Sequence, residues 1–228
     1  MAESKKWTVL SVGGSLLNDG KPNMEMASSL AKIFRKTKLN LGIVCGGGKE
    51  ARIAAQKARD EGGNEFDADL ASVKITHKNA EALRKALGRG SGRKIFINFE
   101  KARDASKKQK YIIMGGTIPG ITTDADSVLL AEALKSKKLI NLSKTAIYTS
   151  DPATNPDAKK FNFLTYGELK QLAAKSDERK AGTHFVFDLL ACSLIARSKI
   201  ESHFIDGRNP EEVKNAILGK PHNGTIVR

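Results

Sequence analysis

The stretch IVCGGGKEAR, residues 43–52, carries the pattern on which the predicted fold depends. A short apolar run ends in three consecutive glycines, and a basic, alanine-rich segment with helical spacing follows at once. Glycine after a strand lets the backbone approach a ligand, and a helix that begins there offers free N–H groups to an anion. The stretch therefore predicts that Gly46, Gly47 and Gly48 leave room for an anion such as phosphate.

Two further segments repeat this junction. They are SVGGSLL, residues 11–17, and MGGTIPGITTDAD, residues 114–126. One glycine turn is often only a tight turn, but ligands of open α/β sheets bind beyond the carboxyl ends of the strands. Three such turns indicate a site for two phosphorylated groups or one long polyphosphate. None fits the G-x-x-x-x-G-K-[ST] or G-x-G-x-x-G motif.

Short apolar runs alternate with segments of helical periodicity along the chain. We predict strands at residues 7–12, 39–45, 94–99, 111–114, 139–142 and 203–205, and helices at 24–37, 50–60, 68–87, 124–135, 185–197 and from an Asn209 cap onward. A short basic helix is expected before residue 111. The alternation favours a single α/β domain over residues 1–228 with a mostly parallel sheet covered on both faces. The turn-rich region 146–184 is interpreted as an insertion or lid.

The composition limits the class of protein. Lysine and arginine total 39 against 25 acids, a net charge of +14, which is typical of proteins with anionic partners but equally of a solubilising surface. The basic tracts 84–94 and 104–110 carry no interleaved aromatics, so we expect no nucleic-acid partner. No apolar run approaches the roughly 20 residues of a membrane span. Cys45 and Cys192 lie in apolar stretches and are interpreted as reduced core residues of a cytoplasmic protein.

Several charged residues lie close to the glycine turns. Asp124 and Asp126 open a helix, where capping is the favoured role for Asp126, whereas Asp124 could hold Mg²⁺ or orient cations among phosphates. Lys49 and Arg52 lie in a first helical turn, which is unfavourable for a cation unless it meets an anion. Asp69 could cap its helix or accept a ribose hydroxyl. The four histidines show no ligand spacing and are interpreted as structural.

At these residues the sequence resembles the amino acid kinase superfamily, and within it the archaeal type of uridylate kinase. The likeness covers nearly the whole chain and includes VGGSLL, GGGKEAR, ITHKNAEAL, MGGTIPGITTDADSVLLAEAL, IYTSDPATNPDAKK, AGTHFVFDLLACSLIARSKI and HNGTIV. The resemblance implies a three-layer αβα sandwich whose N-terminal part binds UMP and whose C-terminal part binds ATP. It implies Mg²⁺-dependent transfer of the ATP γ-phosphate to UMP in pyrimidine nucleotide biosynthesis, and a homohexamer built as a trimer of dimers.

The resemblance also implies roles for individual residues. ATP would be bound by Gly13, Gly14, Ser15, Gly48, Arg52, Ser143, Lys144, Tyr148 and Asp151. UMP would be bound by Gly47, Asp69, Gly116, Thr117, Ile118, Pro119, Gly120, Ile121, Thr122 and Thr123, with Asp69 at the ribose. Asp124 would organise the cations at the transferring phosphoryl group, and Lys49 and Arg52 are the candidate catalytic cations. No residue is assigned as a metal ligand, because Mg²⁺ would arrive with ATP.

The sequence departs from the family pattern at two places. The superfamily usually carries a lysine two residues before the first glycine pair, where this chain has Ser11. Where the family reads roughly T-N-V-D-G-V-Y, this chain reads SKTAIYT at residues 143–149, so one residue and an Asp-Gly pair are missing. The altered loop keeps a second hypothesis open, a nucleotide- or oxoanion-binding storage or regulatory protein on the same fold. An isopentenyl phosphate kinase is disfavoured because Cys45 takes the place of its histidine before the glycines.

Overall fold

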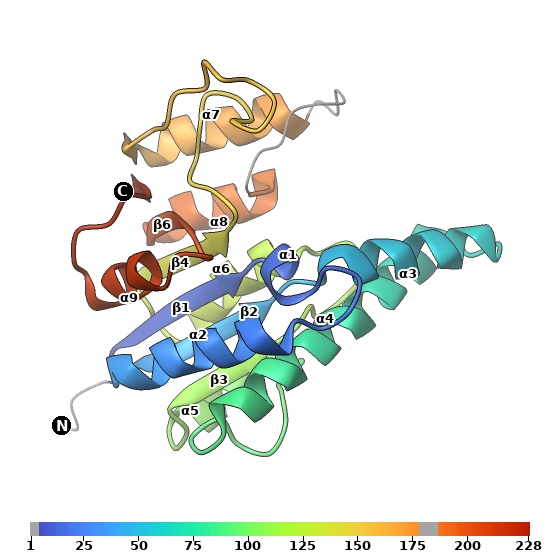
Figure 1. The fold of residues 1–228 in the computed structure, drawn as a ribbon. Coiled ribbons are helices and arrows are strands. Elements are labelled where there is room, and N and C mark those ends of the chain that lie inside the picture. The colour runs from blue at the N-terminus through green and yellow to red at the C-terminus, as the bar shows by residue number, and fades with distance from the viewer. Residues whose placement is uncertain (1–4, 178–186) are drawn as a thin grey trace.

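The computed structural model describes residues 5–177 and 187–228, which form one seven-stranded sheet between two layers of helices (Figure 1). The strands are β1 (Trp7–Val12), β2 (Asn40–Cys45), β3 (Tyr111–Met114), β4 (Lys138–Ser143), β5 (Phe163–Leu164), β6 (Glu201–Asp206) and β7 (Thr225–Val227). Their order in the sheet is β3-β2-β1-β4-β6-β7-β5, and every pair is parallel except β6 with β7. This confirms the predicted fold class.

The helices follow the strands along the chain. They are α1 (Gly14–Leu17), α2 (Met24–Thr37), α3 (Gly48–Asp60), α4 (Glu65–Leu87), α5 (Phe99–Ser106), α6 (Thr123–Ala133), α7 (Tyr166–Asp177), α8 (Leu189–Ser198) and α9 (Pro210–Leu218). Within the described part of the chain, no helix combines the length and the apolar character needed to cross a membrane.

Alternate residues of the central strands bury their side chains in two separate cores. Leu10 of β1 belongs to the core shared with α2, α4 and α9, whereas Val9 belongs to the core shared with α5, α6, α7 and α8. All six residues of β1, including Thr8 and Ser11, are buried, as expected for a strand that is covered on both faces of the sheet. Cys45 and Cys192 are free thiols, each buried in one of the two cores, as predicted.

Two predicted elements are wrong in part. Residues 94–99 do not form a strand, because only Phe96 bridges Met114 and Asn98 already caps α5 by accepting a hydrogen bond from the Lys101 amide at 3.0 Å. The region 146–184 is not simply an insertion, since its described part contributes β5 to the sheet and α7, which packs against α8. The predicted Asn209 cap of α9, with Pro210 at the first position, is confirmed.

Candidate active site

The three glycine turns meet because β1, β2 and β3 are neighbours in the sheet. A Cβ atom on Gly14 would lie 2.0 Å from the Gly48 nitrogen, and one on Gly46 would lie 2.6 Å from the Gly14 nitrogen. Gly48 also has a φ of +73°, which side chains rarely adopt. The space that a side chain would need at Gly14 and Gly46 is therefore filled by the backbone of the neighbouring turn, and the glycines are required for that contact.

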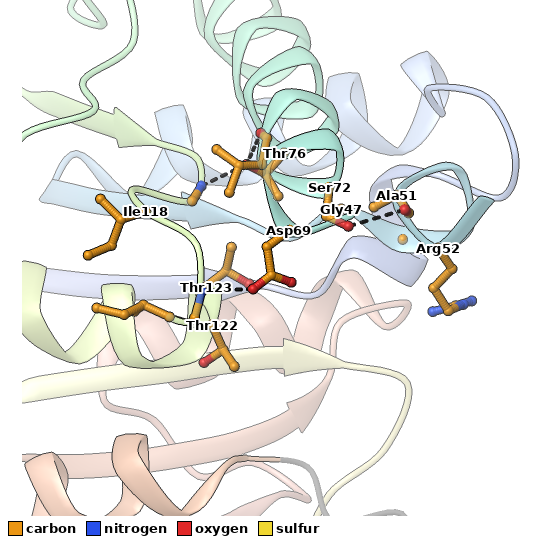
Figure 2. A pocket seen from close by; sticks show the side chains of 14 residues that line it. Gly47, Ala51, Arg52, Asp69, Ser72, Thr76, Ile118, Thr122 and Thr123 are labelled. Carbon is orange, nitrogen blue, oxygen red and sulfur yellow. Dashed lines mark hydrogen bonds between the residues drawn. The ribbon is translucent and has the colours of Figure 1, made fainter. Parts of the chain in front are cut away.

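A cavity of about 560 Å³ opens next to these turns, between α3, α4 and the loop before α6 (Figure 2). Its volume is typical of sites for small molecules. It is lined by Gly47, Gly48, Ala51, Arg52, Asp69, Ser72, Val73, Thr76, Gly116, Ile118, Gly120, Ile121, Thr122 and Thr123. Of the ten residues predicted to bind UMP, the cavity gathers all but Thr117 and Pro119.

Helix α4 holds the loop that forms one wall of the cavity. The Thr76 hydroxyl accepts a hydrogen bond from the Gly116 amide at 2.7 Å, and the His77 ring contacts the Gly116 carbonyl oxygen at 2.7 Å through Nε2. Further along, the Asp69 carboxylate accepts from the Gly120 amide at 2.8 Å. Asp69 therefore does not cap its helix, and its second oxygen stays available at the cavity. This contact with the loop agrees with the interpretation of His77 as structural.

Asp126 fixes the other side of the same loop. Its two carboxylate oxygens accept hydrogen bonds from the Thr117 amide at 3.0 Å and the Thr117 hydroxyl at 2.7 Å. The carboxyl is buried, which raises its pKa to about 6 against the lowering effect of the Thr117 hydrogen bonds. The favoured expectation that Asp126 caps α6 is wrong, because Thr122 is the cap and accepts from the Ala125 amide.

Asp124 lies at the start of α6, against the end of β1. The buried Ser11 hydroxyl donates to its Oδ1 atom at 2.9 Å. Asp124 is half-buried as a residue, and burial of its carboxyl raises the pKa of Asp124 to about 7. The Ser11 hydrogen bond lowers that pKa and the nearby Asp188 carboxylate raises it. Asp124 is thus a carboxylate that a bound cation would stabilise.

The sequence analysis missed Asp188. Its Oδ1 atom accepts from the Ala191 amide at 2.9 Å and so caps α8, and its Oδ2 atom accepts from the Thr122 hydroxyl. Asp188 thereby joins the beginnings of α6 and α8 at the site. An aspartate directly before the apolar run LLACSLIA is a recognisable cap signal, but we placed the start of this helix at residue 185, which lies outside the described residues.

The two candidate cations occupy different places. Arg52 lines the cavity, and Figure 2 shows its side chain at the end of the cavity formed by α3. Lys49 is exposed and is not among the lining residues. Its Cδ atom lies 3.9 Å from where a Cβ on Gly20 would be, so the side chain leans over the turn after α1. Arg52 therefore lies at the cavity, whereas the Lys49 side chain lies near Gly20.

Some of the residues predicted to bind ATP, namely Gly13, Ser143 and Lys144, lie at the end of β4. The Gly13 amide donates to the Leu142 carbonyl at 2.7 Å, which joins the first glycine turn to the end of β4. In the altered loop that follows, the Ser143 hydroxyl donates to the Thr145 carbonyl at 2.7 Å, and Arg208 donates to the Lys144 carbonyl at 3.0 Å. Of the predicted ATP-binding set, only Gly48 and Arg52 line the cavity; Gly13, Gly14, Ser15, Ser143, Lys144, Tyr148 and Asp151 do not.

Comparison with known proteins gives consistent matches. The model of the amino acid kinase family matches residues 6–206. The uridylate kinase of Archaeoglobus fulgidus is 36% identical over 221 residues, covering 96% of this chain and 98% of the relative, and that of Pyrococcus abyssi is 38% identical over 224 residues with the same coverage. The crystal structure of the Archaeoglobus enzyme superposes with a TM-score of 0.86 at 34% identity, covering 98% of this chain and all of that one.

Proposed function

The chain belongs to the amino acid kinase family, and we propose that it acts as a uridylate kinase, which transfers the γ-phosphate of ATP to UMP and releases UDP and ADP. Relatives with 36–38% identity over nearly the full length carry that activity in their names. They favour the enzyme over the storage or regulatory protein considered above. The chain is thus a nucleoside monophosphate kinase, a phosphotransferase.

The observation that carries this proposal is the cavity between α3, α4 and the loop before α6. A nucleoside monophosphate needs a concave site with apolar surface for its base and a few fixed polar groups for its ribose and phosphate. Ile118, Ile121 and Val73 supply the apolar surface, and Asp69 supplies an acceptor for a ribose hydroxyl. Gly116 and Gly120 supply backbone that can approach a phosphate closely. We propose UMP as the occupant.

ATP is proposed to bind on the β4 side, next to the first glycine turn. The hydrogen bond from Gly13 to Leu142 connects the two predicted halves of that site, the turn before α1 and the loop after β4. Gly48 and Arg52 line the cavity and were also predicted as ATP-side residues, so they lie where the two substrates would meet. The transferred phosphoryl group would therefore pass close to Arg52.

The donor set fits Mg²⁺ that arrives with ATP. Mg²⁺ in kinase sites is usually held by one or two carboxylates together with substrate phosphates. Asp124 and Asp188 supply two neighbouring carboxylates, and the described residues contain no cluster of three or more side chains that would hold a metal by themselves. When bound, Mg²⁺ would neutralise charge on the phosphates. Burial raises the pKa of Asp124 to about 7, so the ionised carboxylate is unfavourable in the free protein. A cation bound in the complex with nucleotides would remove this penalty.

The chemistry requires little from the protein beyond position and charge. A phosphate oxygen of UMP forms the new bond to the γ-phosphorus while the bond from that phosphorus to the β-phosphate bridging oxygen breaks, and ADP leaves with the electron pair. The UMP phosphate is largely ionised at neutral pH, so no general base is needed. Backbone amides of the glycine turns and the Arg52 guanidinium are proposed to hold the two phosphates in line, with Asp124 orienting the cations.

A coupled assay of ADP release with Mg²⁺ and ATP tests the proposal, comparing UMP with CMP, AMP and GMP. Turnover selective for UMP is expected. Nucleotide binding without turnover of any monophosphate would contradict the proposal and favour the storage or regulatory protein. We further propose a cytoplasmic homohexamer, for which light scattering should give about 148 kDa, six copies of a 24.7-kDa chain.

A further inference from the structure

The amino ends of the parallel strands lie opposite to the cavity described above. All five parallel strands in the central part of the sheet, β3, β2, β1, β4 and β6, begin at this end, where the chain enters β1 in Figure 1. A lysine stands at or just before the start of each one: Lys110, Lys38, Lys6, Lys137 and Lys199. We call these five residues the lysine row, and we propose that it is a binding surface for duplex nucleic acid.

Hydrogen bonds to main-chain carbonyls connect neighbouring strand starts along the lysine row. The Lys110 carbonyl accepts from the Leu41 amide at 3.0 Å, and the Lys6 carbonyl accepts from the Asn40 side chain at 3.2 Å. The hydroxyl of Ser136, next to Lys137, donates to the Trp7 carbonyl at 2.8 Å. The Lys137 carbonyl in turn accepts from the Glu201 amide at 3.0 Å. Because neighbouring strands are about 4.8 Å apart, the row spans roughly 20 Å.

The charge of this row is not neutralised within the chain. In the part that the structure describes, none of the five lysines forms an ion pair. Two carboxylates lie beside the row. Glu132 forms an ion pair with Arg197 at 2.7 Å. Glu201 contacts the His203 ring at 2.9 Å, but burial lowers the pKa of His203 to about 4, so this histidine is neutral at pH 7 and Glu201 leaves one negative charge beside the five positive ones. Lys38 and Lys199 are helix C-caps, where a cation favours the helix dipole. Lys6, Lys110 and Lys137 are not caps of any described helix, so helix capping does not account for them.

The kind of partner follows from this geometry. One strand of a nucleic acid carries a phosphate every 3.4 Å along the axis, so roughly 20 Å of it offers about six charges to the row. The rings closest to the row, Trp7 and Tyr111, are buried in the core and cannot stack on bases. Single-stranded partners are usually held by such stacking. The surface therefore suits the phosphates of a duplex, without sequence preference.

Tract-by-tract analysis of the sequence could not find this surface. The five lysines come from separate tracts between residues 6 and 199, and only the parallel sheet places them side by side. The inference lies beyond the proposed kinase activity and does not depend on it, since the row and the cavity lie at opposite ends of the strands. Bound duplex and bound nucleotide would not compete.

Fluorescence anisotropy of labelled 20-base-pair DNA and RNA duplexes tests the inference on the full chain. With about four phosphates neutralised, affinity should fall roughly 100-fold between 50 and 200 mM KCl. The variant K6Q/K110Q/K137Q should bind about 10-fold or more weakly at 50 mM, with a salt slope shallower by two to three. The control K57Q/K170Q/K175Q removes the same charge from exposed positions of α3 and α7 and should bind like the unmodified protein.

Four results would overturn the inference. One is the absence of duplex binding at 50 mM KCl, and another is an equal loss in both triple variants, which would assign binding to net charge alone. Displacement of duplex by saturating UMP or ATP would place it in the nucleotide site. Tighter binding to phosphatidylserine vesicles than to either duplex would make the row a membrane surface. Unchanged thermal unfolding and UMP turnover in both variants would show that the fold and the cavity are intact.

Discussion

At the scale of single residues, the site depends on the largely desolvated carboxylate of Asp124. Asp124 is expected to be half-protonated near neutral pH in the free protein, because burial raises its pKa to about 7. In the unfolded chain its pKa is near 3.9. Since the folded-state pKa is the higher one, the ionised carboxylate destabilises the fold, and this cost grows as the pH rises from about 4 to above 7. The ionised Asp124 carboxylate therefore lowers the stability of the fold at the place where the phosphates of the two substrates are proposed to meet.

The variant Asp124→Asn tests this reading. UMP turnover should fall by about 100-fold or more, with little change in the KM for UMP. Without nucleotide or Mg²⁺, the variant should melt roughly 5 °C above the unmodified protein at pH 8, and most of this difference should be lost at pH 4.5, because the cost of ionising Asp124 grows with pH between about 4 and 7. Thermal scans across this pH range measure the difference. A gain in stability that does not depend on pH would show that the carboxylate is not responsible.

A paired substitution separates the two candidate cations. Arg52→Gln should lower kcat/KM by about 100-fold, the usual effect of removing one charged group from a transition state. Lys49→Gln should change it less than threefold, because the lysine side chain leans toward Gly20 and away from the cavity. Steady-state kinetics with both substrates varied measure the two effects. The reverse order of effects would return Lys49 to the catalytic role that the sequence suggests.

At the scale of elements, the glycine turns show what the sequence could and could not predict. Strand, glycines and helix were recognisable in IVCGGGKEAR, because apolar runs and helical periodicity are local properties. The reason for the glycines was not, because the atoms nearest to Gly46 and Gly48 belong to a turn about 30 residues away. Likewise Asp126 reads as a cap in sequence, yet it binds Thr117 across the loop. In both cases, contacts between segments that are distant or separate in the sequence determine the role of the residue.

The contact between turns predicts a large effect of a small substitution. Gly14→Ala would place a methyl group 2.0 Å from the Gly48 nitrogen, so one backbone must move, at a cost of about 3 kcal/mol or more in the free energy of unfolding. Gly167→Ala in α7 is the matched control, since the nearest atom is 3.9 Å away, and it should change stability by about 1 kcal/mol or less. Urea denaturation measures both. Equal stability of the two variants would refute the packing role of Gly14.

The two missed strands have a common cause, and the wrongly predicted strand has another. Strands β5 and β7 contain two and three residues, too few for periodicity to be visible. The predicted strand 94–99 failed because the apolar residues Phe96 and Ile97 stand directly before the Asn98 cap. In each case the neighbouring segments of the fold decide the structure, whereas long elements such as α2 and β1 were predicted with their observed bounds.

At the scale of the whole molecule, the parallel sheet separates two charged regions. The helices α3 and α6 begin at the carboxyl ends of β2 and β3, where their N-termini favour anions. Lysines collect at the opposite end, where α2 and α8 finish. One topology thus explains why glycines, aspartates and helix N-termini gather at the cavity, and why the five lysines of the lysine row lie at the other end of the strands.

The C-terminal strand joins the proposed ATP side to the rest of the sheet. Strand β7 lies between β6 and β5, and the Thr225 hydroxyl accepts from the Ile147 amide at 3.0 Å and donates to the Phe161 carbonyl at 2.6 Å. Thr225→Val keeps the shape but leaves a buried amide without a partner, which costs about 1–3 kcal/mol. Because Ile147 belongs to the altered loop, the KM for ATP should rise several-fold while the KM for UMP stays constant.

Thr8→Val in β1 is the control, since it makes the same chemical change in a strand of the same sheet, near the amino end of β1 and away from that loop. It should leave both KM values unchanged. Initial-rate measurements over a grid of ATP and UMP concentrations separate the two constants. If Thr225→Val raised the KM for UMP instead, or raised both equally, the loop after β4 would not be an ATP-side element. The division of the chain into a UMP-binding N-terminal part and an ATP-binding C-terminal part would then fail, whereas a selective rise would support it.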